Sequence, residues 1–345
     1  MDEPTLSAVT FCVLPRLSGV GGPVSFQNRL VSGLQKMGYN VVNDPRHPRC
    51  TSILLIGGSA RLITEIWRAR RRGVRVVQRL NGMNWLHRKG QGGLRYYLRS
   101  EFNNWMLTLI RKQLADRIVY QSSFAKGWWE RSAGALQKPS RVIHNSVDLN
   151  LFSPEGAHQR PDDHYRVLMV EGHIGGGYEL GLANAVALTQ QLSQQLPKPV
   201  ELMVVGEVSE RLRNYWDEHA GIWIRWMGLV EADRIPEINR SAHLLFSADL
   251  NAACPNSVIE ALSCGLPVIG FATGALPELV GNHAGLVVDY GGNHWNLEPP
   301  NIHGLAAAAR TLLAEQSHYR LSARRRAEAA FRLDKMVEEY LKVLL

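Results

Sequence analysis

Three stretches of small residues stand where an expected strand gives way to an expected helix, and each could bind an anion. They are Gly21-Gly22-Pro23, Gly175-Gly176-Gly177 and Pro255-Asn256-Ser257. Backbone N–H groups at the start of a helix, together with the helix dipole, attract phosphate. One glycine-rich turn is weak evidence, because glycine serves any tight turn. Three such stretches in one chain predict a ligand with phosphate groups.

Glu260 lies one helical turn beyond Ser257, and therefore close to the same expected helix end. A carboxylate in that position can accept two hydrogen bonds from a ribose diol, as the acidic residue of dinucleotide-binding folds does. The alternative is an ordinary helix residue that faces water. Beside a phosphate-binding helix end, Glu260 favours a nucleotide as the ligand.

Most other catalytic patterns are missing from the sequence. It has no Asp-x-Asp for a metal-bridged diphosphate, no His-x-His, no His-Glu-x-x-His, no Gly-x-Ser-x-Gly and no Walker A lysine. A nicotinamide-binding Gly-x-Gly-x-x-Gly also fails, because the run from Gly19 to Gly22 lacks the third glycine at that spacing. We therefore expect no metal and no other cofactor.

The candidate residues need strands and helices that hold them at one edge of a sheet. Short apolar runs alternate along the chain with segments of helical periodicity. The expected strands are 9–14, 52–56, 74–80, 117–120, 140–143, 167–170, 200–205, 222–226, 244–247, 267–271 and 285–288. The predicted fold class is α/β, with two Rossmann-like domains whose parallel sheets face a central cleft and bind ligands beyond the carboxyl ends of their strands.

A length of 345 residues also favours two domains. Residues 154–164 are polar, contain two prolines and lack a hydrophobic period, which predicts a linker. On this basis, residues 1–153 form an N-terminal Rossmann-like domain and residues 165–318 a C-terminal one. Residues 319–345 are expected to be helical.

The net charge of +8 is unevenly distributed. Residues 1–155 contain 23 Lys or Arg against 9 Asp or Glu, whereas residues 156–345 contain 16 against 22. A basic first half suggests an anionic partner, such as a membrane surface, a lipid phosphate, an acidic polymer or nucleic acid. No RRM, KH, zinc-finger or helix-turn-helix pattern supports nucleic acid, so an anionic acceptor or membrane is preferred.

Two expected helices in the basic half combine cationic and aromatic side chains. One, about 60–72, has Leu62, Ile63, Ile66 and Trp67 at helical spacing, followed by the arginines at 68, 70, 71, 72 and 75. The other, about 94–114, contains Tyr96, Tyr97, Phe102, Trp105 and Met106 beside Arg95, Arg99, Arg111 and Lys112. Such a helix can lie on an anionic bilayer. The commoner outcome for a single helix is that the aromatics belong to the core and the arginines face water. The charge asymmetry between the two halves of the chain supports contact with an anionic bilayer.

Nothing in the sequence marks export or insertion into a membrane. No apolar run approaches the roughly 18 to 20 residues of a bilayer-spanning helix. The chain begins Met1-Asp2-Glu3, which is acidic where a signal peptide is basic. The cysteines at 12, 50, 254 and 264 have neither CxxC nor zinc-site spacing, which is typical of reduced thiols. We expect a cytoplasmic protein, with peripheral contact to the inner face of the cell membrane.

A family resemblance rests on three stretches. PNSVIEALSCGLPVIG (255–270), continued by GALPELV (274–280), resembles the donor-site signature of the retaining glycosyltransferases of family 4. VIHNSVDLNLFSP (142–154) is similar to that family's junction between domains, and ADRIVYQS (115–122) to a further motif. The resemblance extends from about residue 9 to about residue 314, with the motifs in the family's order.

The resemblance implies the GT-B fold, in which a C-terminal helix, here within 319–345, returns to the first domain. It implies that residues 1–153 bind the acceptor and that residues 165–318 bind a nucleotide sugar. The residues at matching donor-binding positions are Gly21, Gly22, Trp226, Gly228, Asn256, Ser257, Val258 and Glu260. Among them, Glu260 would bind the ribose, the start of the helix after Pro255 the diphosphate, and the loop from Trp226 the nucleobase.

Two positions that contact the sugar or the acceptor in the family differ here. The first glutamate of the donor signature, eight residues before Glu260, is replaced by Ala252, so the sugar contact would fall to Asp249, Asn251 or backbone. Asn81 stands where the family often has a histidine, and an amide can orient a hydroxyl but cannot act as a general base. Asp249 and Asn81 are the candidate catalytic residues.

The cations that usually surround the diphosphate are also missing. The arginine position is His173, and residues 174–181 contain no lysine. Each such contact can contribute a few kcal/mol to transition-state stabilisation. Backbone N–H groups of Gly175-Gly176-Gly177, or an arginine of the other domain such as Arg16 or Arg79, could replace them.

We therefore expect a retaining glycosyltransferase that moves a sugar from a nucleotide-diphosphate donor to a lipid-linked or saccharide acceptor, in surface polysaccharide or glycolipid assembly. The resemblance implies front-face attack without an enzyme nucleophile or a metal. Two alternatives stay open. One is a GT-B protein that binds sugar nucleotide or glycan without catalysis. The other is a nucleotide-sugar epimerase of the same fold, which needs no acceptor but requires a paired acid and base.

Overall fold

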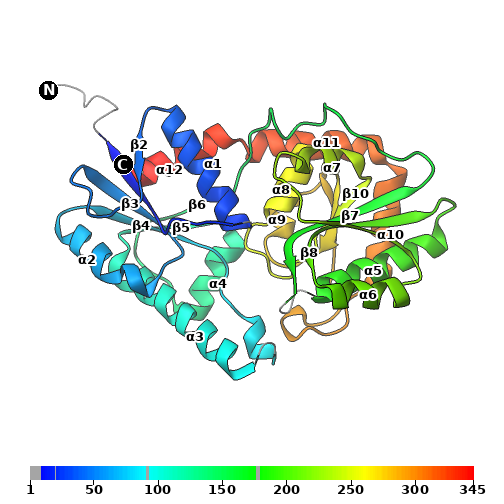
Figure 1. Ribbon diagram of the computed structural model, residues 1–345, viewed down its shortest axis with the longest axis horizontal. Coiled ribbons are helices and arrows are strands. Elements are labelled where there is room, and N and C mark those ends of the chain that lie inside the picture. Colours follow the sequence, from blue (N-terminus) through cyan, green and yellow to red (C-terminus); the bar gives the residue numbers. More distant parts are fainter. Residues whose placement is uncertain (1–8, 20, 91–92, 176–178) are drawn as a thin grey trace. The chain divides into compact units, whose positions relative to one another are not determined.

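The computed structural model describes residues 9–19, 21–90, 93–175 and 179–345. The chain divides into two compact units, one formed by Met1–Ser146 with Leu333–Leu345 and the other by Val147–Arg332. Each unit contains a six-stranded sheet of parallel strands with helices packed against it (Figure 1). The predicted α/β class with two Rossmann-like units is confirmed.

The sheet of the first unit has the strand order β2-β1-β3-β4-β5-β6. Its strands are β1 (Thr10–Leu14), β2 (Asn40–Val42), β3 (Cys50–Ile56), β4 (Arg75–Leu80), β5 (Arg117–Tyr120) and β6 (Ser140–Val142). Its helices are α1 (Gly22–Lys36), α2 (Ile63–Arg71), α3 (Gly93–Leu109), α4 (Ser123–Ala133) and α12 (Leu333–Leu344), with short turns η2 (Ala60–Leu62), η3 (Leu86–Lys89) and η4 (Ile110–Leu114). The order reverses at β1, which pairs with β2 on one side and β3 on the other.

The core of the first unit follows from the period of two along its strands. Phe11 of β1 belongs to a buried cluster that contains Leu30 of α1 and Tyr340 of α12. The next residue, Cys12, belongs to a second cluster, which contains Ile66 of α2. Successive side chains of a strand point to opposite faces, so the two clusters lie on opposite faces of the sheet. Burial of this apolar surface is the main stabilising contribution.

The sheet of the second unit has the strand order β12-β11-β10-β7-β8-β9. Its strands are β7 (Tyr165–Ile174), β8 (Val200–Val208), β9 (Trp223–Gly228), β10 (Leu244–Phe246), β11 (Val268–Phe271) and β12 (Gly285–Val288). Its helices are α5 (Glu179–Gln195), α6 (Glu210–His219), α7 (Ile235–Ser241), α8 (Asn256–Ser263), α9 (Leu276–Val280), α10 (Ile302–Ala314) and α11 (Gln316–Ala330), with a turn η5 (His294–Asn296). The order reverses at β7, which pairs with both β8 and β10.

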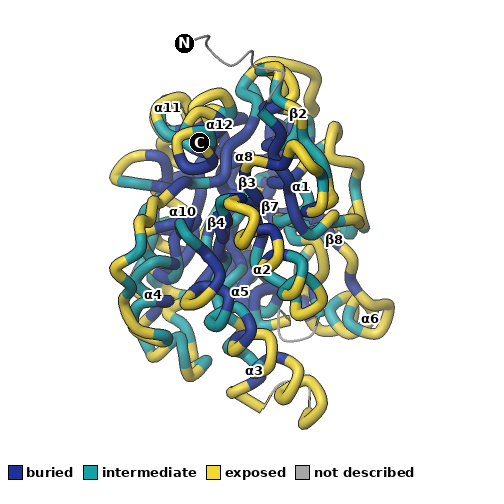
Figure 2. Tube along the Cα trace, turned by 90° about the vertical axis from the view of Figure 1, so that its left-hand side faces the viewer, coloured by how far each residue is buried: buried dark blue, intermediate teal, exposed yellow. Residues whose placement is uncertain are grey.

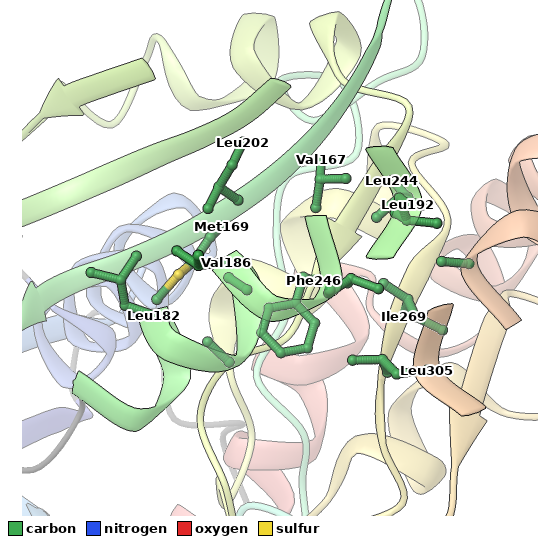
Figure 3. Packing of buried hydrophobic residues seen from close by; sticks show 14 of the residues in the cluster. Val167, Met169, Leu182, Val186, Leu192, Leu202, Leu244, Phe246, Ile269 and Leu305 are labelled. Carbon is green, nitrogen blue, oxygen red and sulfur yellow. The ribbon is translucent and has the colours of Figure 1, made fainter. Parts of the chain in front are cut away.

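One large apolar cluster fills the space between this sheet and the helices α5 and α10. Figure 3 shows Val167 and Phe246 of the strands packed with Leu182 of α5 and Leu305 of α10. The helix α8, which carries the predicted donor-site residues, packs against α7, α9 and α11. The helix α8 is therefore held within the second unit by three other helices.

The surface contrasts with these cores. Strands β3, β4 and β7 are largely buried, whereas much of α3 and α6 is exposed (Figure 2). On α3, Tyr96, Tyr97, Phe102 and Trp105 are exposed, whereas Met106 is buried. The expectation that the aromatic residues of this helix belong to the core is therefore wrong for these four. Among the described helices, none is both long enough and apolar enough to cross a membrane.

The structure divides the chain after Ser146, and the predicted linker 154–164 belongs to the second unit. The guanidinium group of the buried Arg240 donates hydrogen bonds to the carbonyl oxygens of Ser153 (3.1 Å) and Ala157 (3.2 Å). These bonds satisfy backbone groups that a strand or helix would otherwise satisfy. The segment therefore has a fixed place without any hydrophobic period.

Residues 319–345 are shared between the units. The helix α11 packs against α8 in the second unit, and its Arg324 donates to the carbonyl oxygens of Phe152 and Ser263, both at 2.9 Å. The helix α12 instead joins the core of the first unit through Val337 and Tyr340. The last part of the chain thus contributes one helix to each unit.

Candidate functional site

The predicted site residues of the second unit gather at the carboxyl edge of its sheet. β7 and β10 are neighbours at the point where the strand order reverses, and ligands of such sheets bind in the crevice at this point. The last residues of β7 include Glu171 and His173, and Gly175 follows them. Asp249 and Asn251 follow β10, and α8 begins shortly after them.

A pocket of about 230 Å³ opens at the carboxyl ends of β8 and β9. Its lining residues are Gly206, Glu207, Val208, Arg213, Trp226, Gly228 and Leu229. The indole Nε1 of Trp226 donates to Asp217 Oδ1 at 2.8 Å, which holds the ring in place. This volume is smaller than a typical pocket for a whole ligand, so it suits one aromatic part of a larger molecule. The structure therefore brings Trp226 and Gly228 together, with the Arg213 guanidinium beside them.

Gly206 allows β8 to approach β7 closely at this pocket. Its φ of 141° lies in the region that favours glycine, and a Cβ there would lie 2.1 Å from the carbonyl oxygen of Glu171. Any larger residue would push the two strands apart. The position of the pocket next to the end of β7 thus depends on this glycine.

His173 is paired with a carboxylate. Its Nδ1 lies 3.2 Å from Glu207 Oε2, the two residues face each other in the register of β7 and β8, and both side chains are largely exposed. Glu207 also lines the pocket. An imidazole with an acidic neighbour offers less positive charge to a diphosphate than the arginine of the family pattern would.

Two carboxyl groups stand at the reversal of strand order. Burial raises the pKa of Asp249 to about 7, and burial together with the charge of Asp249 raises the pKa of Glu171 to about 8. Carboxyl groups with such pKa values can hold or release a proton near neutral pH. Glu171 was missed by sequence reasoning, and the only available signal was an acidic residue at the end of an apolar strand.

Asn251 is both buried and strained. Only 3% of the residue is exposed, and neither Oδ1 nor Nδ2 has a hydrogen-bond partner among the described residues. Its φ of 63° is left-handed, a region that costs most residues about 1–2 kcal/mol and that asparagine tolerates better than most. Its neighbour Ala252 is fixed, since its carbonyl oxygen accepts a hydrogen bond from Ala275 N at 2.8 Å. Unsatisfied polar groups in strained loops are typical of ligand sites.

The helix α8 begins at Asn256 after Pro255, which is in an extended conformation, and no described side chain caps its amino end. Ser257 is partly buried and Val258 fully buried in its first turn. The first N–H groups of a helix and its dipole attract an anion. Glu260 is buried in the same helix, four residues from its start. The structure thus places Asn256, Ser257, Val258 and Glu260 together in the first turns of one helix.

Asn81 follows β4 in the first unit and is held by its side-chain oxygen. Asn81 Oδ1 accepts hydrogen bonds from Arg79 Nη1 (2.8 Å) and from Gln121 Nε2. Because the oxygen is engaged twice, the side chain can offer a ligand only its Nδ2 hydrogens. Arg79 is 1% exposed, also donates to Asn145 Oδ1 (2.7 Å), and lies 3.6 Å from the ring centre of Phe26. Arg79 therefore acts as a positioning residue inside its own unit.

The predicted glycine loop of the first unit joins β1 to α1. Gly21 precedes the helix with a φ of 128°, and Gly22 is the first helical residue. The side chain of Gln27 fastens the loop, because its Nε2 donates to Pro15 O (2.7 Å) and its Oε1 accepts from Leu17 N (2.8 Å). The amino end of α1 thus follows the carboxyl end of β1, where the strand order of this sheet reverses.

The predicted residues therefore fall into two sets and a remainder. Gly21, Gly22 and Asn81 lie in the first unit. His173, Gly175, Trp226, Gly228, Asp249, Asn256, Ser257, Val258 and Glu260 lie at or near the carboxyl edge of the second sheet. Gly176 and Gly177 lie outside the described residues. Within the described ranges, no group of three or more His, Cys, Asp or Glu comes together as a metal site.

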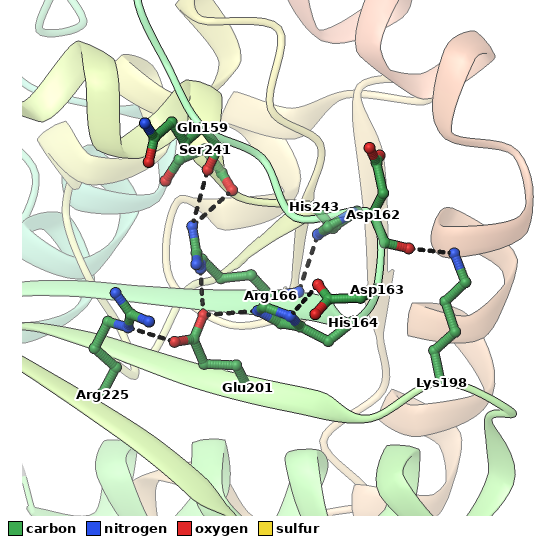
Figure 4. A network of polar contacts seen from close by, with 10 residues as sticks. All are labelled: Gln159, Asp162, Asp163, His164, Arg166, Lys198, Glu201, Arg225, Ser241 and His243. Atoms are coloured by element: carbon green, nitrogen blue, oxygen red, sulfur yellow. Dashed lines mark hydrogen bonds and ion pairs between the residues drawn. The ribbon is translucent and has the colours of Figure 1, made fainter.

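A large polar network of the second unit lies at the opposite, amino edge of the sheet (Figure 4). The fully buried Glu201 accepts hydrogen bonds from Arg166 and Arg225, and His164 Nε2 lies 3.4 Å from Glu201 Oε2. Arg166 N also donates to His243 Nδ1 at 2.9 Å, and burial together with nearby arginines lowers the pKa of His243 to about 3. These contacts fasten the starts of three strands and leave little capacity for a ligand.

Comparisons with known proteins include a family match that lies within the second unit. Residues 177–315 match the family model of glycosyl transferases group 1. The chain is 25% identical over 144 residues, 40% of its length, to a component of the phosphatidylinositol N-acetylglucosaminyltransferase of Homo sapiens. It is 36% identical over 67 residues, 19% of its length, to O-antigen chain mannosyltransferase B of Escherichia coli. The matches span only 28% and 17% of those two relatives.

Solved structures match almost the whole chain. Sucrose-phosphate synthase of Thermosynechococcus elongatus has a TM-score of 0.74 at 16% identity, covering 97% of this chain and 98% of that one. Anabaena HepE in complex with UDP and glucose has a TM-score of 0.71 at 13% identity. WaaG, a glycosyltransferase involved in lipopolysaccharide biosynthesis, has a TM-score of 0.68 at 14% identity. Each of these two matches covers 97% of this chain and 99% of the other. Residues 177–315 therefore resemble the group 1 glycosyltransferases, and the chain as a whole has the GT-B fold.

Proposed function

We propose that the chain is a retaining glycosyltransferase that moves a sugar from a nucleotide-diphosphate donor to a lipid-linked or saccharide acceptor, in surface polysaccharide or glycolipid assembly. The observation that carries the proposal is the pocket lined by Trp226, Gly228 and Arg213. It lies within the region matched to group 1 glycosyltransferases and at the sheet edge where α8 begins. The complex of Anabaena HepE with UDP and glucose supports a nucleotide sugar as the donor.

The donor would bind in three parts. The base would stack against Trp226 in the pocket, and the ribose diol would bind the carboxylate of Glu260. The diphosphate would bind at the amino end of α8, where helix N–H groups and the dipole attract negative charge. Each part thus has a matching group on one edge of one sheet.

The negative charge of the leaving diphosphate needs compensation in the transition state. Arg213 lines the pocket and is the candidate from this structure for part of the charge that the family's cations supply. His173 would contribute a hydrogen bond, although Glu207 at 3.2 Å competes for it. No enzyme nucleophile and no metal is part of this proposal.

The acceptor would bind the first unit. Asn81 can donate through Nδ2 to a hydroxyl or phosphate oxygen, and the start of α1 at Gly22 offers backbone N–H groups to a lipid-linked phosphate. The excess of basic residues in the first half favours an anionic acceptor at the cytoplasmic face of a membrane. Attack on the same face as the departing diphosphate would retain the configuration of the sugar.

The test is calorimetric titration of the purified chain with UDP, GDP and ADP, with and without Mg²⁺. We expect micromolar binding of one nucleotide without metal, and a loss of about tenfold or more in Glu260→Ala, because one charged pair of hydrogen bonds disappears. Glu237→Ala is the matched control, since this glutamate of α7 pairs with Arg234 at the surface. Absence of binding to all three nucleotides would refute the donor site.

The carboxyl pair of Glu171 and Asp249 favours a second candidate, a nucleotide-sugar epimerase. Two nearby carboxyl groups with raised pKa values could supply the acid and the base that this chemistry requires. Incubation with a nucleotide sugar in the absence of an acceptor separates the candidates. An epimeric nucleotide sugar would support the epimerase, slow release of free nucleotide the transferase, and an unchanged but bound donor a protein without catalysis.

A further inference from the structure

Three amide side chains meet at the carboxyl ends of neighbouring strands in the first unit. Asn81 directly follows β4 and Gln121 directly follows β5, and the last residues of these two strands are partners in the register. Asn145 lies shortly after β6, the next strand of the sheet. Gln121 and Asn145 are 4% and 3% exposed, whereas Asn81 is partly exposed. Two of the amides are therefore buried beneath the one that a ligand can reach.

The three amides and the guanidinium group of Arg79 form a closed cycle of hydrogen bonds. Arg79 donates to Asn81 Oδ1 at 2.8 Å and to Asn145 Oδ1 at 2.7 Å. Gln121 Nε2 also donates to Asn81 Oδ1, and Asn145 Nδ2 donates to Gln121 Oε1 at 3.4 Å. We call these four residues the amide cycle.

Arg79 sets the direction of the amide cycle, because a guanidinium group has N–H donors and no acceptor. Only the side-chain oxygens of Asn81 and Asn145 can face it. Gln121 then has to turn its nitrogen toward the Asn81 oxygen and its oxygen toward the Asn145 nitrogen. The orientation of all three amides thus follows from one arginine, and Asn81 Nδ2 lies outside the cycle.

The surroundings hold Asn81 and Arg79 in place. The indole Nε1 of the fully buried Trp129 donates to the carbonyl oxygen of Asn81 at 2.7 Å, and Arg79 lies 3.6 Å from the centre of the Phe26 ring. Among the described residues, none accepts a hydrogen bond from Asn81 Nδ2. A hydrogen bond from a cation polarises an amide and strengthens its own N–H groups as donors. The cycle therefore presents two strengthened donors to a ligand.

We propose that Gln121 and Asn145 are positioning residues, which hold Asn81 as a hydrogen-bond donor toward a phosphate oxygen of the acceptor. This inference rests on the proposed function, in which the first unit binds the acceptor. The hydroxyl that attacks the sugar has to give its proton to an acceptor, and Asn81 Nδ2 cannot take it. A charged phosphate oxygen only accepts hydrogen bonds, so it matches the fixed direction of the amide cycle.

The test follows the side-chain amide resonances of Asn81 by NMR in the full chain, assigned by their absence from the Asn81→Asp variant. The probe is octyl phosphate, with octyl glucoside as the neutral control ligand. We expect octyl phosphate to shift these resonances and octyl glucoside to leave them unchanged. Calorimetry should show at least about tenfold weaker binding of octyl phosphate to Gln121→Met, since the orientation of Asn81 is no longer held. The matched control is Gln113→Met, an exposed glutamine of η4 that should bind like the parent chain.

The Asn81→Asp variant separates donation from folding. Its carboxylate can still accept from Arg79 and Gln121, so the denaturant midpoint should not fall. The loss of both donors should weaken octyl phosphate binding by about tenfold or more. The inference is overturned if Asn81→Asp or Gln121→Met binds octyl phosphate as tightly as the parent chain, or if octyl glucoside shifts the Asn81 resonances equally.

Glu260→Ala separates this inference from the proposed donor site. Octyl phosphate should shift the Asn81 resonances equally in this variant, because Glu260 belongs to the second unit. Loss of the shift in Glu260→Ala would assign the phosphate to the donor and overturn the inference. Failure of UDP, GDP and ADP to bind would refute the donor site but leave the octyl phosphate shifts unchanged, so the two proposals can fail separately.

Discussion

The two edges of the second unit's sheet hold their polar groups in opposite ways. At the amino edge, the carboxylate of Glu201 is fully buried and has three cationic or imidazole partners. At the carboxyl edge, Asp249 and Glu171 have raised pKa values, and the buried amide of Asn251 has no partner in the described part of the chain. Buried polar groups are normally satisfied, because an unmade hydrogen bond costs free energy. The contrast separates an edge whose polar groups are paired within the fold from an edge where some described polar groups are not.

The largest effect should come from the amino edge. Glu201→Gln leaves Arg166 and Arg225 buried or half-buried without their carboxylate, and breaking such a network costs about 3–5 kcal/mol. The measurement is the free energy of unfolding from a denaturant titration. The matched control is Glu207→Gln, whose exposed pair with His173 should contribute less than about 0.5 kcal/mol. Equal effects of the two substitutions would erase the distinction between the edges.

At the carboxyl edge, the buried Asp249 should instead lower the free energy of unfolding as the pH rises. The pKa of Asp249 is raised from 3.8 to about 7, so between these values the unfolded state has lost a proton that the folded state still binds. Ionisation then favours the unfolded state, and the free energy of unfolding falls as the pH increases through this window. Asp249→Asn should remove this loss and make the protein about 1–2 kcal/mol more stable at pH 8, with no gain at pH 4.

Denaturant titrations of both proteins from pH 4 to pH 8 measure this difference. Asp289→Asn, in the exposed loop after β12, is the control and should leave the pH dependence unchanged. If the Asp249→Asn protein loses stability with pH as steeply as the parent chain, the raised pKa is not located at Asp249.

The sequence predicted most of the fold because the relevant signals are local. Runs such as 167–170 and 202–205 are apolar at every position, which is what a strand covered by helices on both faces requires. The sequence carries no local signal for the fixed place of residues 154–164 in the second unit, because the hydrogen bonds from Arg240 to Ser153 and Ala157 join residues more than 80 positions apart. The expectation that the aromatic residues of α3 belong to the core was wrong for a related reason. Periodicity shows that one face of a helix is apolar, but it does not show what covers that face.

The candidate site was predictable only where a motif marks it. Glu260 was found from its place one helical turn beyond Ser257 and Trp226 through the resemblance, and the structure places both at the expected edge. Glu171 and Arg213 carry no motif, so only the packing of β7 beside β10 and the lining of the pocket revealed them. The strain of Asn251 is a property of backbone geometry that no residue type announces.

Relief of that strain should raise stability and lower function. Asn251→Gly removes the cost of the left-handed φ and the two unsatisfied amide atoms, so we expect a gain of up to about 1 kcal/mol in the free energy of unfolding. The same change should weaken binding of the nucleotide sugar by about tenfold while leaving the free nucleotide unaffected. Calorimetry with both ligands measures the difference. A loss of stability in Asn251→Gly would show that the amide has a structural role, as at the amino edge.

The smallest effect on nucleotide binding should come from the exposed pair of His173 and Glu207 at the ends of β7 and β8. Variants of this pair show whether a group of the carboxyl edge acts through its charge or through its shape. Glu207→Gln should bind the nucleotide more tightly by a few-fold, because it frees His173 from a competing carboxylate at 3.2 Å and removes a negative charge from the pocket wall. His173→Ala should weaken binding by a similar factor, with a stability change below about 0.5 kcal/mol in both variants. Both effects should fade at high salt, since the groups are exposed. If Glu207→Gln still binds the nucleotide more tightly at high salt, the residue affects the shape of the pocket and not its charge.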